Sequence, residues 1–282
     1  MAWRTTIRRR AKNRLDHLPA ALRDPVSRML LRVYEALVAF RQSLHERRDG
    51  SPPLPLPPPR LRVMVVGHAD PGAFLDEGRR HNQVIREAAA RAGFEIEGAE
   101  RLLDWGCGCG RVMRWWADLP ETAVHGCDYN SKLVRWVNGN LPFAEARKND
   151  LEPPLPYGGE EFDVAYAISI FTHLSNDLAA AWMAEIRRVL RPGGVFFFTT
   201  HGRAYRDRLE PARGARFDDG EPVVLFPAAE GSNLCASYHP TEWVRDRLLA
   251  GFELVELREA HRLPPDRLDG LLQDRWLIRK LA

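Results

Sequence analysis

The feature that most constrains the fold is an apolar strand pattern that runs into a loop of alternating glycines. Residues 102–104 are apolar enough for a buried strand, Gly106, Gly108 and Gly110 follow at alternate positions, and residues 111–118 read as a helix. Glycines let the backbone turn sharply and leave no Cβ between it and a ligand. Free N–H groups at the start of the next helix favour a carboxylate or phosphate. The pattern predicts a ligand-binding turn between a strand and a helix.

Two details of this turn distinguish it from a dinucleotide-binding turn. The glycine spacing is G-x-G-x-G, whereas an NAD-dependent oxidoreductase would need the longer G-x-G-x-x-G. A carboxylate, Asp104, precedes the first glycine, where it can meet a cationic amino group such as that of a methionine moiety. An ordinary strand-to-helix turn is the plain alternative, and the carboxylate argues against it.

Strand and helix patterns alternate along most of the chain, which predicts a doubly wound α/β sheet. The last two strands should form an antiparallel hairpin, because little helical pattern lies between them. Strands are predicted at residues 62–66, 102–104, 123–127, 143–147, 162–168, 195–200, 252–257 and 276–279, and helices at 71–92, 111–118, 131–139, 176–190 and 240–250.

Polar residues also follow the next two predicted strands. Asp128 closes the strand after the glycine loop, where a carboxylate can accept hydrogen bonds from both ribose hydroxyls of a nucleoside. A helix cap is the alternative role for Asp128. Residues 148–151 follow the third strand, where a side-chain acceptor can meet an adenine amino group. A solvated loop carboxylate is the alternative role for Asp150.

Taken together, these elements resemble a class I S-adenosylmethionine-dependent methyltransferase over residues 62–282. Residues 104–111, 125–128, 170–174 and 191–194 are especially similar to a bacterial subgroup often of unassigned substrate. The resemblance implies S-adenosylmethionine as cofactor and a seven-stranded Rossmann-like sheet of order 3-2-1-4-5-7-6 with the seventh strand antiparallel. It also implies a cofactor site in which the methionine end is lined by Asp104, Gly106, Cys107, Gly108 and Gly110, the ribose is held by Asp128 and Tyr129, the adenine is flanked by Asn149, Asp150 and Leu151, and Ala167 and Ile168 close over it.

Candidates for a catalytic base must lie beyond the carboxyl edge of the sheet. His173 follows the fourth core strand and His201 ends the fifth, so both are candidates, although each can equally be a hydrogen-bonded structural histidine. Tyr238 and His239, before a helix, rank lower. Arg79 can reach the cofactor carboxylate or lie on the surface. Positioning alone can supply much of the rate of methyl transfer.

The chain divides into three predicted parts. Residues 1–51 form a basic helical arm with 12 Lys/Arg against 5 Asp/Glu, residues 52–59 hold six prolines and predict a stiff linker, and residues 60–282 form the catalytic domain. Within that domain, residues 202–239 exceed a usual connection and predict a substrate lid. The arm has three interpretations: packing or dimerisation, peripheral membrane contact, or nucleic-acid contact.

The expected function is methyl transfer to a small polar acceptor, with O-methylation of a sugar or secondary metabolite favoured by the polar lid and the family likeness. A nucleic-acid partner is not expected, because no segment resembles an RNA-binding module. N- or C-methylation, nucleic-acid methylation and a non-catalytic S-adenosylmethionine-binding scaffold remain alternatives. The four cysteines fit neither a disulfide framework nor zinc spacing, so no metal is expected. With no secretory signal and no long apolar run, a cytoplasmic location is expected, with contact at the inner membrane face as a further option.

Overall fold

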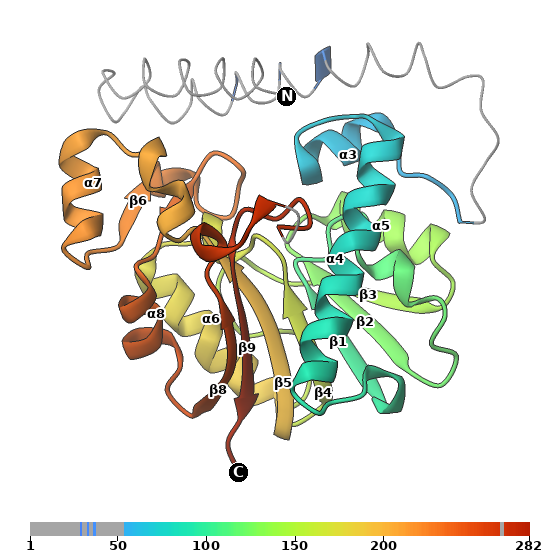
Figure 1. Ribbon diagram of the computed structural model, residues 1–282. Coiled ribbons are helices and arrows are strands. Elements are labelled where there is room, and N and C mark those ends of the chain that lie inside the picture. The colour runs from blue at the N-terminus through green and yellow to red at the C-terminus, as the bar shows by residue number, and fades with distance from the viewer. Residues whose placement is uncertain (1–28, 30–32, 34–35, 38–53, 266–267) are drawn as a thin grey trace.

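The computed structural model describes residues 29, 33, 36–37, 54–265 and 268–282. A seven-stranded sheet forms its centre, in the order β3-β2-β1-β4-β5-β9-β8 (Figure 1). The strands are β1 Arg101–Trp105, β2 Ala123–Asp128, β3 Ala144–Lys148, β4 Phe162–Ala167, β5 Leu190–Thr200, β8 Phe252–Arg258 and β9 Asp274–Lys280. Strands β1 to β5 are parallel where they pair, and β9 runs antiparallel to both β5 and β8. This confirms the expected fold class, the strand order and the final hairpin.

Each face of the sheet is covered by its own hydrophobic cluster, because successive side chains of a strand point to opposite faces. Helices α4 Pro71–Arg91 and α5 Ser131–Asn140 cover one face, against residues such as Leu102 and Val164. Helices α6 Asn176–Val189 and α8 Thr241–Leu248 cover the other face, against their strand neighbours Leu103 and Ala165. Apolar side chains therefore cover both faces of the sheet, and a ligand can bind only at the ends of the strands.

Two predicted elements near the glycine loop are wrong. Residues 62–66 form part of helix α3 Pro59–Val66, not a strand. Proline at the first helical position favours the helix, and buried Arg62 fixes it by donating from Nε to the Ala69 carbonyl at 2.9 Å. Residues 111–118 hold only the short 3₁₀ helix η2 Met113–Trp116. A 3₁₀ turn aligns residues three apart, and Met113 and Trp116 are both fully buried.

The described end of the proline segment lies against the domain. The Leu54 and Leu56 side chains pack on the two hydrophobic clusters next to α4 and the glycine loop, and Pro57 is buried. Arg114 donates from Nη2 to the Leu54 carbonyl at 2.8 Å. The domain boundary at residues 59 and 60 stays a prediction. The predicted arm and its three interpretations lie outside the described residues, apart from residues 29, 33 and 36–37.

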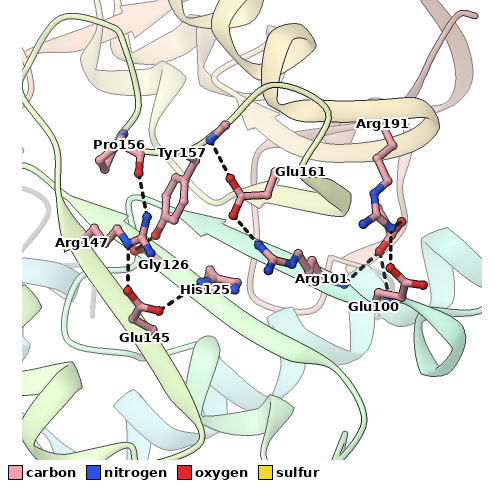
Figure 2. Close-up of polar contacts among 12 residues, drawn as sticks. Glu100, Arg101, His125, Gly126, Glu145, Arg147, Pro156, Tyr157, Glu161 and Arg191 are labelled. Atoms are coloured by element: carbon pink, nitrogen blue, oxygen red, sulfur yellow. Dashed lines mark hydrogen bonds and ion pairs between the residues drawn. The ribbon is translucent and has the colours of Figure 1, made fainter.

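Residues 149–161 connect β3 to β4 without a helix or strand and are held by polar contacts (Figure 2). Tyr157 donates from its hydroxyl to the Gly126 carbonyl at 2.7 Å, and Arg147 donates to the Pro156 carbonyl at 3.0 Å. Glu145 pairs with Arg147 at 2.8 Å. These contacts tie the far end of the connection to β2 and β3, which fixes the path of the chain before it enters β4.

A small subdomain stands over one end of the sheet between β5 and α8 (Figure 1). It contains η4 Arg203–Arg208, α7 Pro211–Asp218, η5 Pro227–Ala229 and a two-stranded antiparallel ribbon of β6 Val223–Leu225 and β7 Ala236–Tyr238. It has its own apolar cluster, which includes Tyr205 and Phe217. Residues 202–239 therefore include two short strands, β6 and β7. The role of this segment as a lid stays a prediction.

Candidate functional site

A cavity of about 220 Å³ lies at the carboxyl ends of β1, β2 and β4. Ten of the twelve predicted cofactor residues line it: Asp104, Gly106, Cys107, Gly108, Asp128, Tyr129, Asn149, Asp150, Leu151 and Ile168. The other two lie behind the wall. A Cβ added to Gly110 would lie 2.5 Å from Leu141 Cδ1, and Ala167 is fully buried in the core. Ten of the predicted residues therefore share one cavity, and the contact of all twelve with a cofactor stays a prediction.

The glycine loop forms one wall of the cavity, and its backbone is tied to β2. Gly106 and Cys107 donate from their N–H groups to the Cys127 carbonyl at 2.9 and 3.0 Å. Gly106 and Gly108 have positive φ angles of 78° and 56°, a region that side chains with a Cβ rarely adopt. A Cβ on Gly106 would lie 2.1 Å from Ile170 Cδ1. The conformation thus favours glycine at both positions, and a Cβ at Gly106 would also displace the Ile170 side chain.

Asp104, the penultimate residue of β1, is a buried carboxylate in the cavity wall. Its Oδ2 accepts a hydrogen bond from the Tyr166 hydroxyl at 2.6 Å, and that hydroxyl accepts one from Trp116 Nε1 at 3.0 Å. Burial raises the pKa of Asp104 to about 7, against the lowering effect of the Tyr166 hydrogen bond and of the Arg111 charge. A cationic ligand group would favour the ionised carboxylate.

Asp128 holds the glycine loop as well as facing the cavity. Its Oδ2 accepts from the Gly108 N–H at 3.0 Å and its Oδ1 accepts from the Asn130 N–H at 2.8 Å. Burial raises the pKa of Asp128 to about 6, while these two backbone hydrogen bonds lower it. Each carboxylate oxygen has a second lone pair, so acceptance from a ribose hydroxyl remains chemically open. The cap of α5 is Asn130, not Asp128.

Asn149 and Asp150 differ in their suitability for adenine. The Asp150 side chain is 85% exposed and pairs with Lys148 at 2.9 Å, as in the solvated-carboxylate alternative. Asn149 is buried, donates from Nδ2 to the Asp150 carbonyl at 2.6 Å, and has no hydrogen-bond partner for its buried Oδ1 among the described residues. A buried orphan acceptor fits an adenine amino donor. Leu151 lies beside it, with its carbonyl held by Trp182 Nε1 at 2.9 Å.

The two candidate bases differ in position. His173, in η3 Phe171–His173, lines the cavity, and its Nδ1 lies 2.7 Å from the Cys235 carbonyl. His201 does not line the cavity. Its ring packs against Tyr205 with the two ring centroids 4.1 Å apart, and its Nδ1 lies 3.1 Å from the Ser237 carbonyl. Burial lowers the pKa of His201 well below its usual value, which suits a neutral structural histidine.

The lower-ranked candidates lie away from the cavity lining. Tyr238 is buried in the subdomain cluster, and His239 is fully buried and stacked on Trp243 at 5.0 Å. The Arg79 side chain is 65% exposed and lies 3.7 Å from Asp76. Arg79 is therefore a surface arginine.

The sequence missed several residues of the cavity wall. Met64 and Val65 of α3 line it, as do Ser232 and Asn233 of the subdomain and Arg111 after the glycine loop. Asn233 donates from Nδ2 to the Met64 carbonyl at 2.7 Å, across 169 positions of sequence. Only packing reveals such a contact. Arg111 alone carried a local signal, because it directly follows the last glycine.

Comparisons with known proteins agree with this geometry. Residues 103–198 match the family model described as a methyltransferase domain. A Mycolicibacterium smegmatis protein, named as a probable S-adenosylmethionine-dependent methyltransferase, is 35% identical over 127 residues, which are 44% of this chain and 45% of that protein. A Salmonella typhimurium malonyl-[acyl-carrier protein] O-methyltransferase is 32% identical over 99 residues, 35% of this chain and 38% of that protein. The chain thus matches less than half the length of these curated relatives.

Solved structures show the same fold. A methyltransferase structure from Methanosarcina mazei superposes with a TM-score of 0.52 at 19% identity, covering 67% of this chain and 96% of that chain. Residues 103–198 thus match a methyltransferase domain, and the chain is similar to S-adenosylmethionine-dependent methyltransferases in sequence over this region and in fold. The residues present fit S-adenosylmethionine: a buried carboxylate for the amino group, a second for the ribose, and an orphan acceptor for the adenine.

Two further findings concern metal ions and membranes. Among residues 54–265 and 268–282 and the four described positions before them, no group of three or more His, Cys, Asp or Glu is arranged to hold a metal ion. Within the same residues, no helix has both the length and the apolar character needed to span a bilayer.

Proposed function

We propose that this protein transfers the methyl group of S-adenosylmethionine to an oxygen of a small polar acceptor, such as a sugar or a secondary metabolite. The observation that carries the proposal is one cavity that joins two buried carboxylates, Asp104 and Asp128, to the side chain of His173. The carboxylates are suited to the cofactor, and the histidine is suited to the acceptor. S-adenosylmethionine supplies an electrophilic methyl group on a sulfonium, which leaves as a neutral thioether.

His173 is the residue we propose as general base. A carbonyl accepts hydrogen bonds and cannot donate them, so the contact with the Cys235 carbonyl places the ring proton on Nδ1 and a lone pair on Nε2. A hydroxyl acceptor must lose its proton as the new bond to the methyl carbon forms. His173 belongs to the segment directly after β4, at the edge of the sheet where the cavity lies.

The subdomain supports a polar acceptor. Its residues Ser232 and Asn233 bring hydroxyl and amide groups to the cavity wall. The backbone N–H of Gly231 donates to the His173 carbonyl at 2.8 Å, so the same loop that contributes these groups also contacts the proposed base. The similarity to an O-methyltransferase from Salmonella typhimurium is consistent with an oxygen acceptor.

The test is methyl transfer from isotopically labelled S-adenosylmethionine to a panel of hydroxylated metabolites, amines and RNA, with products identified by mass spectrometry. We expect labelled ethers or esters from hydroxyl or carboxyl acceptors. With a hydroxyl acceptor, His173→Ala should lower turnover by about 10²–10⁴-fold at unchanged cofactor affinity. His201→Ala, the matched control, should keep turnover within a few-fold in the folded protein.

Other results would contradict the proposal. Label found only on nitrogen, on carbon or on nucleic acid would show that the acceptor is not an oxygen of a small polar molecule. Tight cofactor binding with no transfer to any acceptor would favour a non-catalytic scaffold. Normal turnover of His173→Ala with a hydroxyl acceptor would show that His173 is not the general base. Positioning of the two substrates would then account for the rate.

A further inference from the structure

The Arg111 side chain is a buried cation in the cavity wall. It is 9% exposed, and the charges of Glu77 and Asp104 partly offset the cost of burying it. Its Nε is buried and has no hydrogen-bond partner among those residues. Burying a charged group is costly, so proteins place opposite charges near it. Arg111 lines the cavity, where a ligand can bring a further negative charge.

The guanidinium of Arg111 is held by a neutral histidine. Its Nη1 lies 2.6 Å from Nδ1 of His81, which comes from α4, 30 positions earlier. A guanidinium can only donate, so His81 Nδ1 accepts and the imidazole proton sits on Nε2. Burial, together with the nearby Arg111 charge, lowers the pKa of His81 well below its usual value. His81 therefore orients Arg111 without neutralising it.

Arg111 shares the cavity with Asp104, and both groups are charged when the carboxyl is ionised. An α-amino acid carries an ammonium and a carboxylate on one carbon. A carboxylate and a guanidinium in one small cavity are complementary to those two charges, and the planar guanidinium suits a carboxylate in particular.

We propose that Arg111, oriented by His81, binds the α-carboxylate of the methionine moiety of the cofactor, while Asp104 receives its amino group. This rests on the proposed function only in taking S-adenosylmethionine as the ligand. It replaces Arg79, the exposed arginine that the sequence offered for this role, with a buried one.

The experiment measures the affinity of the full chain by calorimetry for three ligands that differ at the amino-acid end. S-adenosylhomocysteine has both charges, its decarboxylated analogue keeps the amine alone, and 5′-methylthioadenosine has neither. Arg111→Met should weaken S-adenosylhomocysteine by about ten- to a hundredfold, as for the loss of a charged hydrogen bond, and should leave the other two ligands within about twofold. Arg79→Met, the matched control, should change none of them.

His81 acts through Arg111, so its variants have their own signature. His81→Leu should weaken S-adenosylhomocysteine but not 5′-methylthioadenosine, and His81→Gln, which retains an acceptor, should recover much of the loss. Equal weakening of all three ligands by Arg111→Met would show a structural role and overturn the proposal.

A comparison in the unmodified protein keeps the test independent of any variant's folding. If the decarboxylated analogue binds as tightly as S-adenosylhomocysteine, no cation reads the carboxylate and the proposal is wrong. Failure of all three adenosine ligands to bind would instead overturn the cofactor assignment itself. Binding of these ligands without any methyl transfer would contradict the proposed function but not the proposed role of Arg111.

Discussion

At the scale of single residues, the site depends on buried carboxylates whose hydrogen bonds serve the loop and the ligand together. Asp128 accepts from Gly108 and Asn130, so its removal affects both the glycine loop and the ribose contact. Asp128→Ala should weaken S-adenosylhomocysteine by roughly 1.5–3 kcal/mol, as for a hydrogen bond to a charged group. Calorimetry checks this, with exposed Asp150→Ala as the control. Equal losses in both variants would mean that Asp150, not Asn149, reads the adenine.

The pH dependence of binding follows from Asp104 and Asp128, whose pKa values are about 7 and about 6 in the free protein. A bound ammonium or hydroxyl donor favours the ionised carboxylates, so binding releases protons and affinity should rise from about pH 5.5 to about 7.5. An α-amino group loses its own proton near pH 8, so affinity should fall again above that value.

Asp104→Asn separates the two carboxylates. The variant should lose the upper part of the rising limb and keep a weaker rise centred near pH 6, from Asp128. Calorimetry in buffers of different ionisation enthalpy counts the protons released. An affinity that is flat from pH 5.5 to 7.5 in the parent protein would show that neither carboxylate changes its protonation on binding.

Sequence reasoning reached some residues and not others for physical reasons. Asp104 and Asp128 were predictable because each ends an apolar strand, and parallel strands end at one edge of the sheet. Asn149 and Asp150 are neighbours at a strand end, and only the fold decides which one turns inward. The contact of Arg111 with His81 depends on how α4 packs beside the glycine loop, which no local pattern records.

At the scale of elements, the glycine loop has a positive φ at Gly106, where the Ile170 side chain also leaves no room for a Cβ. Gly106→Ala would place a Cβ 2.1 Å from Ile170 Cδ1 at a positive φ, so either the loop or Ile170 must move. We expect a loss of cofactor affinity of at least about tenfold, together with a lower free energy of unfolding.

Gly139→Ala is the control for this substitution. Gly139 lies in α5 without a positive φ, and a Cβ added there would meet nothing within 4 Å. Alanine should therefore stabilise the protein by about 0.5–1 kcal/mol and leave binding unchanged. Thermal unfolding with and without S-adenosylhomocysteine measures both effects. Unchanged affinity in Gly106→Ala would show that the loop tolerates a side chain at this position.

Regular elements were more predictable than the short ones beside the site. Helix α4 begins at its predicted proline, with Asp70 accepting from the Ala73 N–H at 3.0 Å as its cap. The valine-rich run before it looked like a strand, yet it is helix α3, since tertiary contacts of Arg62 outweigh a local β preference. The short 3₁₀ helix η2 was equally hidden, because burial of Met113 and Trp116 selects it.

At the scale of the whole molecule, the end of the proline segment belongs to the packed structure. Removing residues 1–53 should leave cofactor affinity within a few-fold. Removing residues 1–58 also deletes Leu54 and Leu56 from the hydrophobic clusters, and it takes carbonyl acceptors from Arg62 and Arg114. The longer truncation should lower the melting temperature by about 5 °C or more. Equal melting temperatures for both truncations would show that residues 54–58 contribute no stability.

The central claim is that the cavity at the carboxyl edge of the sheet binds S-adenosylmethionine. Isothermal titration calorimetry of the full chain with S-adenosylmethionine, S-adenosylhomocysteine and NAD tests it most directly. We predict saturable heat at micromolar concentrations with the first two ligands, weaker binding of both in Asp128→Ala, and no heat with NAD. Heat with NAD and none with either adenosylated ligand would contradict the account.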